Sequence, residues 1–140
     1  MPTPSQLTLY PDQQALSQAH HWLEQLADQH SWTRPLRLTL QLVMDEALNN
    51  IVRHGFGPHP PAEALIQLRV VVASAHIHLD IQDNGMPFDP TRRVPDEPAT
   101  RLDDAMPGGH GLRLMRHYLH DMAYHHADGY NNLRLTIDAS

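Results

Sequence analysis

The chain has 140 residues, the size of one ordinary domain, and 41% of them are hydrophobic, which suffices for a single core. The net charge is −6 and the positive charges are scattered, which argues against direct nucleic-acid binding. Because the sequence shows no apolar run of roughly 20 residues, no signal-peptide pattern and no cysteine, we expect a cytoplasmic protein without a membrane span or disulfides.

The first half of the chain predicts a short strand followed by two helices. Residues 6–10 have the pattern of a strand, and residues 12–29 carry an apolar helical stripe, with Asp12 as the expected N-cap. A longer helix is predicted over residues 35–54, where apolar side chains again recur on one face. Glycines and prolines directly after it end this helix in a loop.

Two strands come next and are predicted to form a hairpin. One face of the first strand carries Ile66, Leu68, Val70 and Val72, and one face of the second carries Ile77, Leu79 and Ile81. Residues 84–107 are poor in regular structure and hold five of the twelve prolines. So long a loop in a small domain is typical of a lid or a binding segment.

The chain is predicted to end with a helix over residues 110–122 and a hairpin that turns at Asp128-Gly129. In its last strand, Leu133, Leu135 and Ile137 point inward. Helices combined with antiparallel strands favour an α+β fold, a two-layer sandwich in which a mixed, mostly antiparallel sheet packs on helices. We expect residues 1–140 to form a single domain.

The second predicted helix carries polar side chains near its C-terminal end. Glu46, Asn50 and His54 are spaced four residues apart and therefore lie along one side of the helix. A solvated polar face is the ordinary explanation of such a pattern. Asparagine, however, favours caps and turns over helix interiors, so the pair Asn49-Asn50 indicates that an amide is needed there, as a metal or hydrogen-bond ligand.

Asp83 ends the second strand of the central hairpin and has the parity of its core-facing residues. A carboxylate on that side needs a partner, and two partners fit about equally well: the amino group of a ligand, or the backbone of a turn that Asp83 caps. Asn84-Gly85 alone would signal another hairpin, but the prolines that follow at positions 87 and 90 cannot extend a ladder.

A glycine-rich segment, PGGHGLRLMR over residues 107–116, runs directly into the last predicted helix. Glycines at a helix start let the backbone approach an anion, where unpaired N–H groups can bind it. The segment is not a Rossmann fingerprint, because a third glycine and a preceding strand are missing. Taken alone, it is more typical of a plain connector.

Three motifs occur in a fixed order: EALNN with HGF, then DNGMPFDP, then GGHGLRLMR. Together they resemble the GHKL ATP-binding superfamily, and the short single-domain form resembles its anti-sigma-factor serine kinases over nearly the whole chain. The resemblance implies the Bergerat ATP-binding fold, with ATP and Mg²⁺ as cofactors. It also implies a sigma factor and an anti-anti-sigma antagonist protein as partners, and members of this family commonly form homodimers.

The resemblance further implies roles for the matching residues. Asn50 would coordinate the Mg²⁺ that bridges the nucleotide phosphates. Glu46 would act as general base or orient the attacking hydroxyl group. Asp83 would receive the adenine amino group, directly and through water, while Gly85 would allow close approach of the base. His54 would form a hydrogen bond near the site.

The remaining matches concern the phosphates. Gly109 and Gly111 would bind phosphate through their backbone amides, residues 94–107 would form the ATP lid, and Arg101 is a candidate phosphate contact in that lid. The sequence contains no lysine, which excludes the P-loop lysine and the strand lysine of eukaryotic-type kinases. A metal ion and backbone amides can neutralise the triphosphate instead.

Two functions stay open. The first is a protein serine kinase that sequesters a sigma factor and phosphorylates its antagonist, and Glu46 favours it. The second is a nucleotide-gated protein-binding module with little or no kinase activity, which the acidic lid favours. A domain of a larger histidine kinase ranks third. Many relatives carry a threonine near the start of the last strand, where this chain has Asn131 and Asn132, so the adenine contact from that strand also stays open.

Histidine accounts for twelve residues and invites a metal interpretation. The obvious pairs are His20-His21, His117 with His120, and His125-His126. Since no acidic residue completes a facial set of ligands, and His117 with His120 can equally belong to a solvated helix face, we do not expect a structural zinc site.

Overall fold

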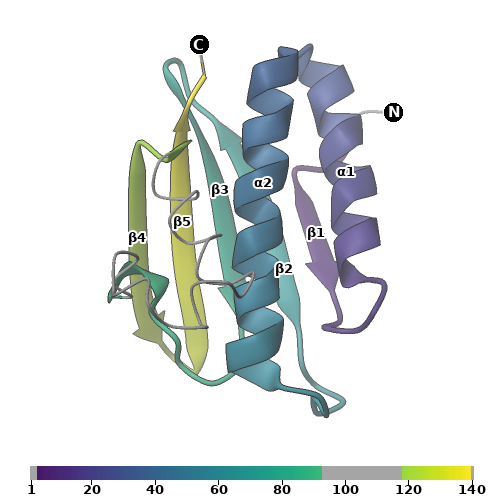
Figure 1. Cartoon of the computed structure of the whole chain (residues 1–140), viewed down its shortest axis with the longest axis vertical. Helices are drawn as coiled ribbons and strands as arrows, with labels where there is room; N and C mark the ends of the chain where they lie inside the picture. The colour runs from purple at the N-terminus through teal and green to yellow at the C-terminus, as the bar shows by residue number, and fades with distance from the viewer. Residues whose placement is uncertain (1–2, 93–117, 140) are drawn as a thin grey trace, which may run out of the picture.

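The structure is a computed structural model that describes residues 3–92 and 118–139. Two helices cover one face of a five-stranded sheet (Figure 1), and the strands lie in the order β1-β2-β3-β5-β4. All four neighbouring strand pairs in this sheet are antiparallel. This arrangement confirms the predicted α+β sandwich with a mostly antiparallel sheet.

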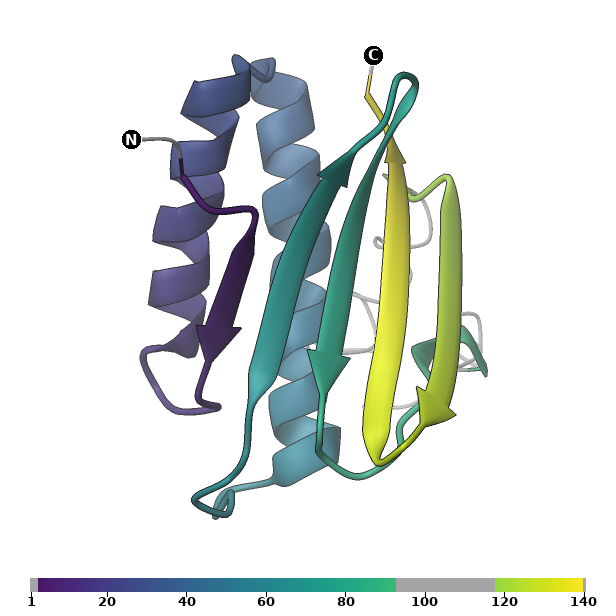
Figure 2. The ribbon, with the colours of Figure 1, turned by 180° about the vertical axis from the view of Figure 1, so that it is seen from behind.

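The elements follow one another as β1 (Gln6–Leu9), α1 (Ala15–His30), α2 (Arg34–Asn50), the π-helix η1 (Ile51–Phe56), β2 (Ile66–Val72), β3 (His76–Asp83), the 3-10 turn η2 (Pro90–Arg92), β4 (Asp121–Ala127) and β5 (Tyr130–Asp138). Seen from behind, the opposite face of the sheet is not covered by the helices (Figure 2). Within the described part of the chain, no helix has the length and apolar character needed to cross a membrane.

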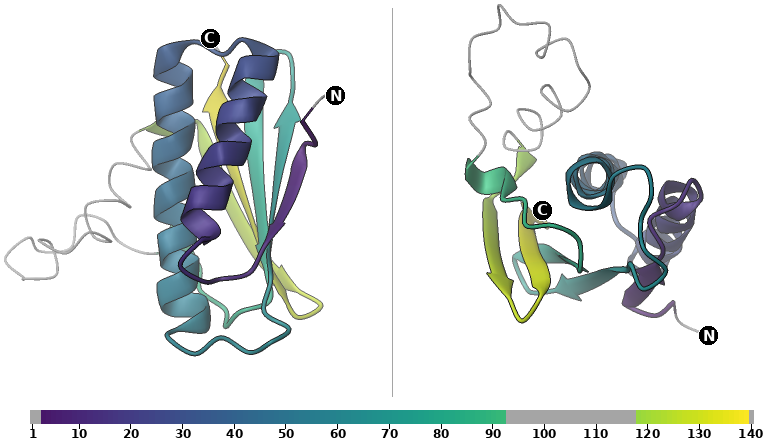
Figure 3. Two further views of the ribbon diagram at one scale, coloured as in Figure 1. Left: turned by 90° about the vertical axis from the view of Figure 1, so that its right-hand side faces the viewer. Right: turned by 90° about the horizontal axis from the view of Figure 1, so that it is seen from below.

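The hydrophobic core lies between the sheet and the two helices (Figure 3). Alternate residues of the central strands point into it, because successive side chains of a strand lie on opposite faces. The largest fully buried side chains are Leu23, Leu26, Leu40, Met44 and Leu48 from the helices and Ile66, Leu68, Ile77, Leu79 and Ile81 from the sheet. Each such side chain contributes roughly 1.5–3 kcal/mol relative to an exposed position.

The start of α1 differs from the prediction. The helix begins at Ala15, and its N-cap position is Gln14, which makes no side-chain capping bond. Asp12 is therefore not the N-cap. Its Oδ1 instead accepts a hydrogen bond from the backbone N–H of Gln14 at 2.9 Å, a local turn of the kind aspartate favours. The helix therefore begins three residues later than the predicted start at residue 12.

The second helix begins close to the predicted position, and the Thr33 hydroxyl accepts a hydrogen bond from the backbone of Leu36 as its N-cap. Its regular α-helical part ends at Asn50, earlier than predicted, and continues as the π-helix η1. Gly57 then ends the helix at φ 73°, with its N–H bonded to the carbonyl of Val52 at 2.9 Å. Single π-turns inside helices occur often at functional sites.

One residue of the predicted apolar face of β2 is not buried. Ile66, Leu68 and Val70 lie in the core, whereas Val72 is 48% exposed, because it is the last residue of β2, beside the hairpin turn. The prediction of the last helix is wrong in part. Residues 110–117 of the predicted last helix lie outside the described residues. The helix does not extend to residue 122, since β4 already begins at Asp121 and the N–H of His120 donates to the carbonyl of Thr136 in β5 at 2.8 Å.

Candidate functional site

Asp83 is the last residue of β3 and is only 3% exposed. Its register partners are Ile66 in β2 and Asn131 in β5. Its burial on the side of Ile77, Leu79 and Ile81 confirms the direction that strand parity predicted. Strand pairing on both sides therefore holds a carboxylate at the edge of the hydrophobic core.

Two hydrogen bonds to Asp83 end on the same oxygen. The N–H of Gly85 donates to Oδ1 at 2.8 Å, and Nδ2 of Asn131 donates to Oδ1 at 2.9 Å. The first of these is the turn-capping bond considered above. Among the described residues, nothing else donates a hydrogen bond to this carboxylate, so both of these bonds fall on Oδ1 and none on Oδ2.

Burial raises the pKa of Asp83, because removal from water disfavours the charged carboxylate. The hydrogen bonds from Asn131 and Gly85 oppose this shift, and so does the nearby His126. Desolvation is the largest of these influences. The carboxylate is thus incompletely compensated by the protein and would gain from a further donor.

Asn131 is the principal polar neighbour of Asp83 and is 5% exposed. Its Nδ2 also lies 3.2 Å from the carbonyl of Gly85 and 3.1 Å from that of Met86, while its Oδ1 accepts a hydrogen bond from the Tyr124 hydroxyl at 2.5 Å. The neighbouring Asn132 instead accepts a hydrogen bond from Gln82. Of the two neighbouring asparagines, Asn131 is therefore the one that bonds to Asp83.

The loop after β3 is tied to the end of the second helix. A Cβ atom at Gly85 would lie 2.7 Å from the carbonyl oxygen of Gly55, so only glycine fits there without movement of the backbone. The N–H of Met86 donates to the same carbonyl at 2.8 Å. Asn84 bonds to the backbone of Glu63 and Leu65, which gives the Asn-Gly pair a role other than a hairpin.

The polar residues of α2 are not a solvated face throughout. Glu46 and Asn50 are 8% and 3% exposed, whereas Asn49 is exposed. Nδ2 of Asn50 is buried and has no hydrogen-bond partner among the described residues. A buried amide without a partner is costly, which fits a position that receives a ligand. His54 stacks on Phe88 with the ring centres 4.3 Å apart and an angle of 11° between the rings.

A small cavity brings the helix and the strand end together. Its volume is about 20 Å³, and its walls include Asn50 from α2, Asp83 from β3, and Phe88, Tyr124 and Asn131. A space of this size holds about one water molecule. Bound organic ligands usually occupy about 300–1,000 Å³, so this cavity is too small for such a ligand. Either the described residues form only part of a larger pocket, or the side chains that line the cavity must move to admit a ligand.

A larger hollow, of about 430 Å³, lies on the face of the sheet opposite the helices. Polar side chains line it, including Gln67, Arg69 and the ion pair between Asp80 and Arg134. Although it is larger, none of the described residues that line it is a buried carboxylate or a buried amide. We therefore place the candidate site at the smaller cavity, which is lined by the buried Asp83 carboxylate and by the buried Asn50 amide, whose Nδ2 has no hydrogen-bond partner among the described residues.

Four predicted features lie outside the described residues: Gly109, Gly111, Arg101 and the lid over residues 94–107. The structure brings Asn50, Asp83 and, through the loop, Gly85 to one region. Sequence analysis did not identify Phe88 and Tyr124, whose side chains help line the cavity. The pairing of Tyr124 with Leu133 across β4 and β5 places its ring there, and only a known register could have predicted this.

Comparison with known proteins adds independent findings. Residues 9–137 match the model of the histidine kinase-like ATPase domain. Over 118 residues, the chain is 49% identical to the serine/threonine-protein kinase BtrW of Bordetella bronchiseptica, covering 84% of this chain and 82% of that protein. A solved structure of the Acinetobacter baumannii histidine kinase AdeS aligns with a TM-score of 0.47 and 15% identity over 74% of this chain and 47% of that one.

A family model that matches from β1 into β5 takes in both the helix with Asn50 and the strand end with Asp83. The ATPase description of that family implies that this chain binds ATP. The chain belongs to the histidine kinase-like ATPase domain family.

Proposed function

We propose that the chain is an ATP-dependent protein serine kinase that sequesters a sigma factor and phosphorylates its anti-anti-sigma antagonist. The observation that carries the proposal is that Asn50 and Asp83 line the same cavity, because an asparagine amide can hold a metal ion and a buried carboxylate can recognise the amino group of a base. The 49% identity to a serine/threonine-protein kinase over most of both chains supports a kinase rather than another ATPase.

Asp83 would recognise adenine. Its Oδ1 is engaged by Gly85 and Asn131, so Oδ2 would accept a hydrogen bond from the exocyclic amino group. Guanine carries a carbonyl oxygen where adenine carries this amino group. The site would disfavour guanine, because the carbonyl oxygen and Oδ2 are both hydrogen-bond acceptors. Gly85 is required by the approach of Gly55, and it would also leave room beside the base.

Asn50 would hold Mg²⁺ together with the nucleotide phosphates. Its amide supplies a hard oxygen donor, and Mg²⁺ typically combines few protein ligands with water and phosphate oxygens. The buried Nδ2 of Asn50, which has no partner among the described residues, is a hydrogen-bond donor, so a phosphate oxygen beside the ion would satisfy it while Oδ1 faces the ion. When bound, the ion supplies charge neutralisation that a chain without lysine must obtain elsewhere.

Glu46 would serve as the general base one helical turn before Asn50. In the transfer, the serine oxygen of the substrate bonds to the γ-phosphorus while the bond to the β–γ bridging oxygen breaks. The hydroxyl proton passes to the Glu46 carboxylate, and ADP leaves with the electron pair of the broken bond.

The remaining assignments complete the same proposal. Gly109 and Gly111 would bind phosphate through backbone amides, Arg101 would approach it from the lid over residues 94–107, and His54 would support the site through its stack on Phe88. We also propose that the chain acts in the cytoplasm, as a single domain over residues 1–140, and forms a homodimer.

Transfer of the labelled γ-phosphate from ATP to an antagonist domain tests the kinase. We expect the parent protein to label the antagonist, and Glu46→Gln to label it at least 100-fold more slowly while binding Mg–ATP normally. Tight Mg–ATP binding without transfer to any antagonist would instead identify a nucleotide-gated binding module. Capture of partners from cell extract with ADP and then with ATP would test whether a sigma factor and an antagonist are the proteins bound.

A further inference from the structure

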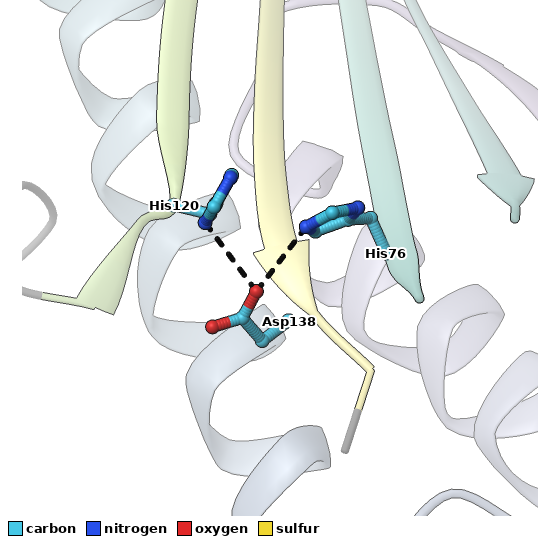
Figure 4. A group of neighbouring side chains, drawn as sticks. All are labelled: His76, His120 and Asp138. Atoms are coloured by element: carbon cyan, nitrogen blue, oxygen red, sulfur yellow. Dashed lines mark ion pairs between the residues drawn. The ribbon is translucent and has the colours of Figure 1, made fainter. Parts of the chain in front are cut away.

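Two histidines and an aspartate gather at the end of the sheet opposite the candidate nucleotide site (Figure 4). His76 begins β3, Asp138 ends β5, and His120 directly precedes β4. Seven residue steps along β3 separate His76 from Asp83, or roughly 23 Å at the usual rise per residue. The cluster is therefore too far from the candidate nucleotide site to belong to it.

Backbone pairing brings these three residues together. His76 and Asp138 are register partners in the β3–β5 ladder, so their side chains lie on the same face of the sheet. The N–H of Ala139 donates to the carbonyl of Ala75 at 3.0 Å and extends this pairing beyond the strand ends. His120 is held by the bond from its own N–H to the carbonyl of Thr136.

The separations of the side-chain atoms match the coordination shell of a small divalent ion. Nε2 of His76 lies 3.4 Å from Oδ1 of Asp138, and Nδ1 of His120 lies 3.5 Å from the same oxygen. One donor atom from each residue lies within 4.8 Å of the other two. A tetrahedral Zn²⁺ with bonds of about 2.0–2.2 Å places its ligands about 3.3–3.6 Å apart, so two edges already fit.

We propose that His76, His120 and Asp138 form a binding site for Zn²⁺ or a similar divalent transition-metal ion. Two imidazoles and one carboxylate are suitable donors for such an ion, and water would fill the remaining position. The side chains are 33%, 53% and 64% exposed in that order, which leaves the site open to an ion from solution. A bound ion would connect the ends of β3 and β5 with the chain entering β4.

A simple ion-pair cluster is the alternative. In that case a protonated histidine would contact Asp138 without any metal. The two nitrogen–oxygen separations, however, exceed the roughly 2.7–2.9 Å of a charge-assisted hydrogen bond. His20 and Asp45 illustrate the closer arrangement, because their side chains are hydrogen-bonded to each other. No third metal-binding residue joins that pair among the described residues, which makes it a useful control.

Calorimetric titration of the metal-free full chain with ZnCl₂, without nucleotide or Mg²⁺, tests the proposal. We expect one ion per chain, a melting temperature that rises with Zn²⁺ concentration, and at least a tenfold loss of affinity in each of His76→Ala, His120→Ala and Asp138→Asn. The control His20→Ala should keep the parental affinity.

Circular dichroism checks that each variant is folded, which we expect since the three side chains are partly or largely exposed. The proposal is overturned by absence of binding at millimolar Zn²⁺, or by a folded variant of any of the three residues that retains the parental affinity. An equal loss in His20→Ala would also overturn it, because binding would then be distributed over the surface histidines. None of these three results bears on the proposed kinase.

Discussion

Strands β3 and β5 are paired along their common length, yet their two ends present polar groups in opposite settings. At one end, Asp83 and Asn131 are 3% and 5% exposed and hydrogen-bonded to each other. At the other end, the register partners His76 and Asp138 have side chains that are 33% and 64% exposed. The same pair of strands thus supports a buried polar site at one end and, at the other, an exposed cluster of residues of the kinds that bind metal ions.

The difference shows what each end requires from its surroundings. A buried carboxylate must be satisfied by protein or ligand, so the positions of its neighbours matter strongly. An exposed cluster has water as an alternative partner, and its ion pairs contribute little unless an ion holds the groups together. Single substitutions should therefore have large effects at the Asp83 end and small effects along the exposed face.

The largest expected effect is that of Asn50→Ala. Loss of the amide oxygen should abolish Mg²⁺-dependent ATP binding. The fold should survive, because the substitution removes Nδ2, a buried donor without a hydrogen-bond partner among the described residues. Calorimetry of ATP binding with and without Mg²⁺ measures this. The matched control is Asn49→Ala, one residue away and exposed, which should bind as the parent does. Equal Mg²⁺ dependence in Asn50→Ala and the parent would refute the assignment.

Asp83→Asn should weaken ATP binding by about 10- to 100-fold. Hydrogen bonds to charged groups contribute about 1.5–3 kcal/mol, and the asparagine amide would face the adenine amino group with a donor or a weaker acceptor. A titration with ATP and ADP checks the loss, which should be similar for both because the base is common to them. If this variant binds both nucleotides like the parent, Asp83 does not recognise adenine.

The same substitution should raise the stability of the unliganded fold at neutral pH. Because burial raises the pKa of Asp83 in the folded state, the folded chain holds its proton to higher pH than the unfolded chain does. The stability that the protonated Asp83 side chain contributes to the folded state is therefore lost as the pH rises from 3.8, the ordinary pKa of aspartate, through the raised pKa of the folded state. Urea unfolding should show the advantage of Asp83→Asn growing over that interval, and an advantage that shrinks would contradict the sign.

Gly85→Ala and Gly55→Ala should change stability in opposite directions although the two glycines touch. A methyl group at Gly85 would meet the backbone of Gly55 at 2.7 Å, and we expect a loss of about 1–3 kcal/mol. A methyl group at Gly55 would meet its nearest neighbours at 3.7 Å, and we expect a gain of about 0.4–1 kcal/mol from reduced freedom of the unfolded chain. Urea unfolding compares the pair directly.

The smallest effect is expected midway along the same two strands. Arg134 and Asp80 are register partners joined by two hydrogen bonds of 2.7 and 2.8 Å, and the Arg134 side chain is 49% exposed. Arg134→Ala should cost less than about 1 kcal/mol and leave ATP binding unchanged. The cost should fall further at high salt. A larger loss of stability would show that the solvent exposure of a side chain on β3 or β5 does not determine how strongly its substitution affects the protein.

Part of the candidate site could be predicted from local sequence. Strand parity placed Asp83 on the core side, and the asparagine pair in a helix drew attention to Asn50, because both signals depend only on neighbouring residues. Element boundaries were less predictable. Asp12 forms a local turn with Gln14 where α1 was predicted to begin. The N–H of His120 donates to the carbonyl of Thr136 in β5, where a helix was expected.

The sequence by itself determined the α+β pattern, the apolar faces that meet in the core, and the order of motifs that indicates an ATPase. Only the tertiary structure decided that Asn131 rather than Asn132 bonds to Asp83, that Gly85 faces the backbone of Gly55, and that Asp138 joins His76. The physical reason is range: side-chain alternation and helix periodicity follow from the local backbone, whereas these contacts depend on which strands pair and in which register.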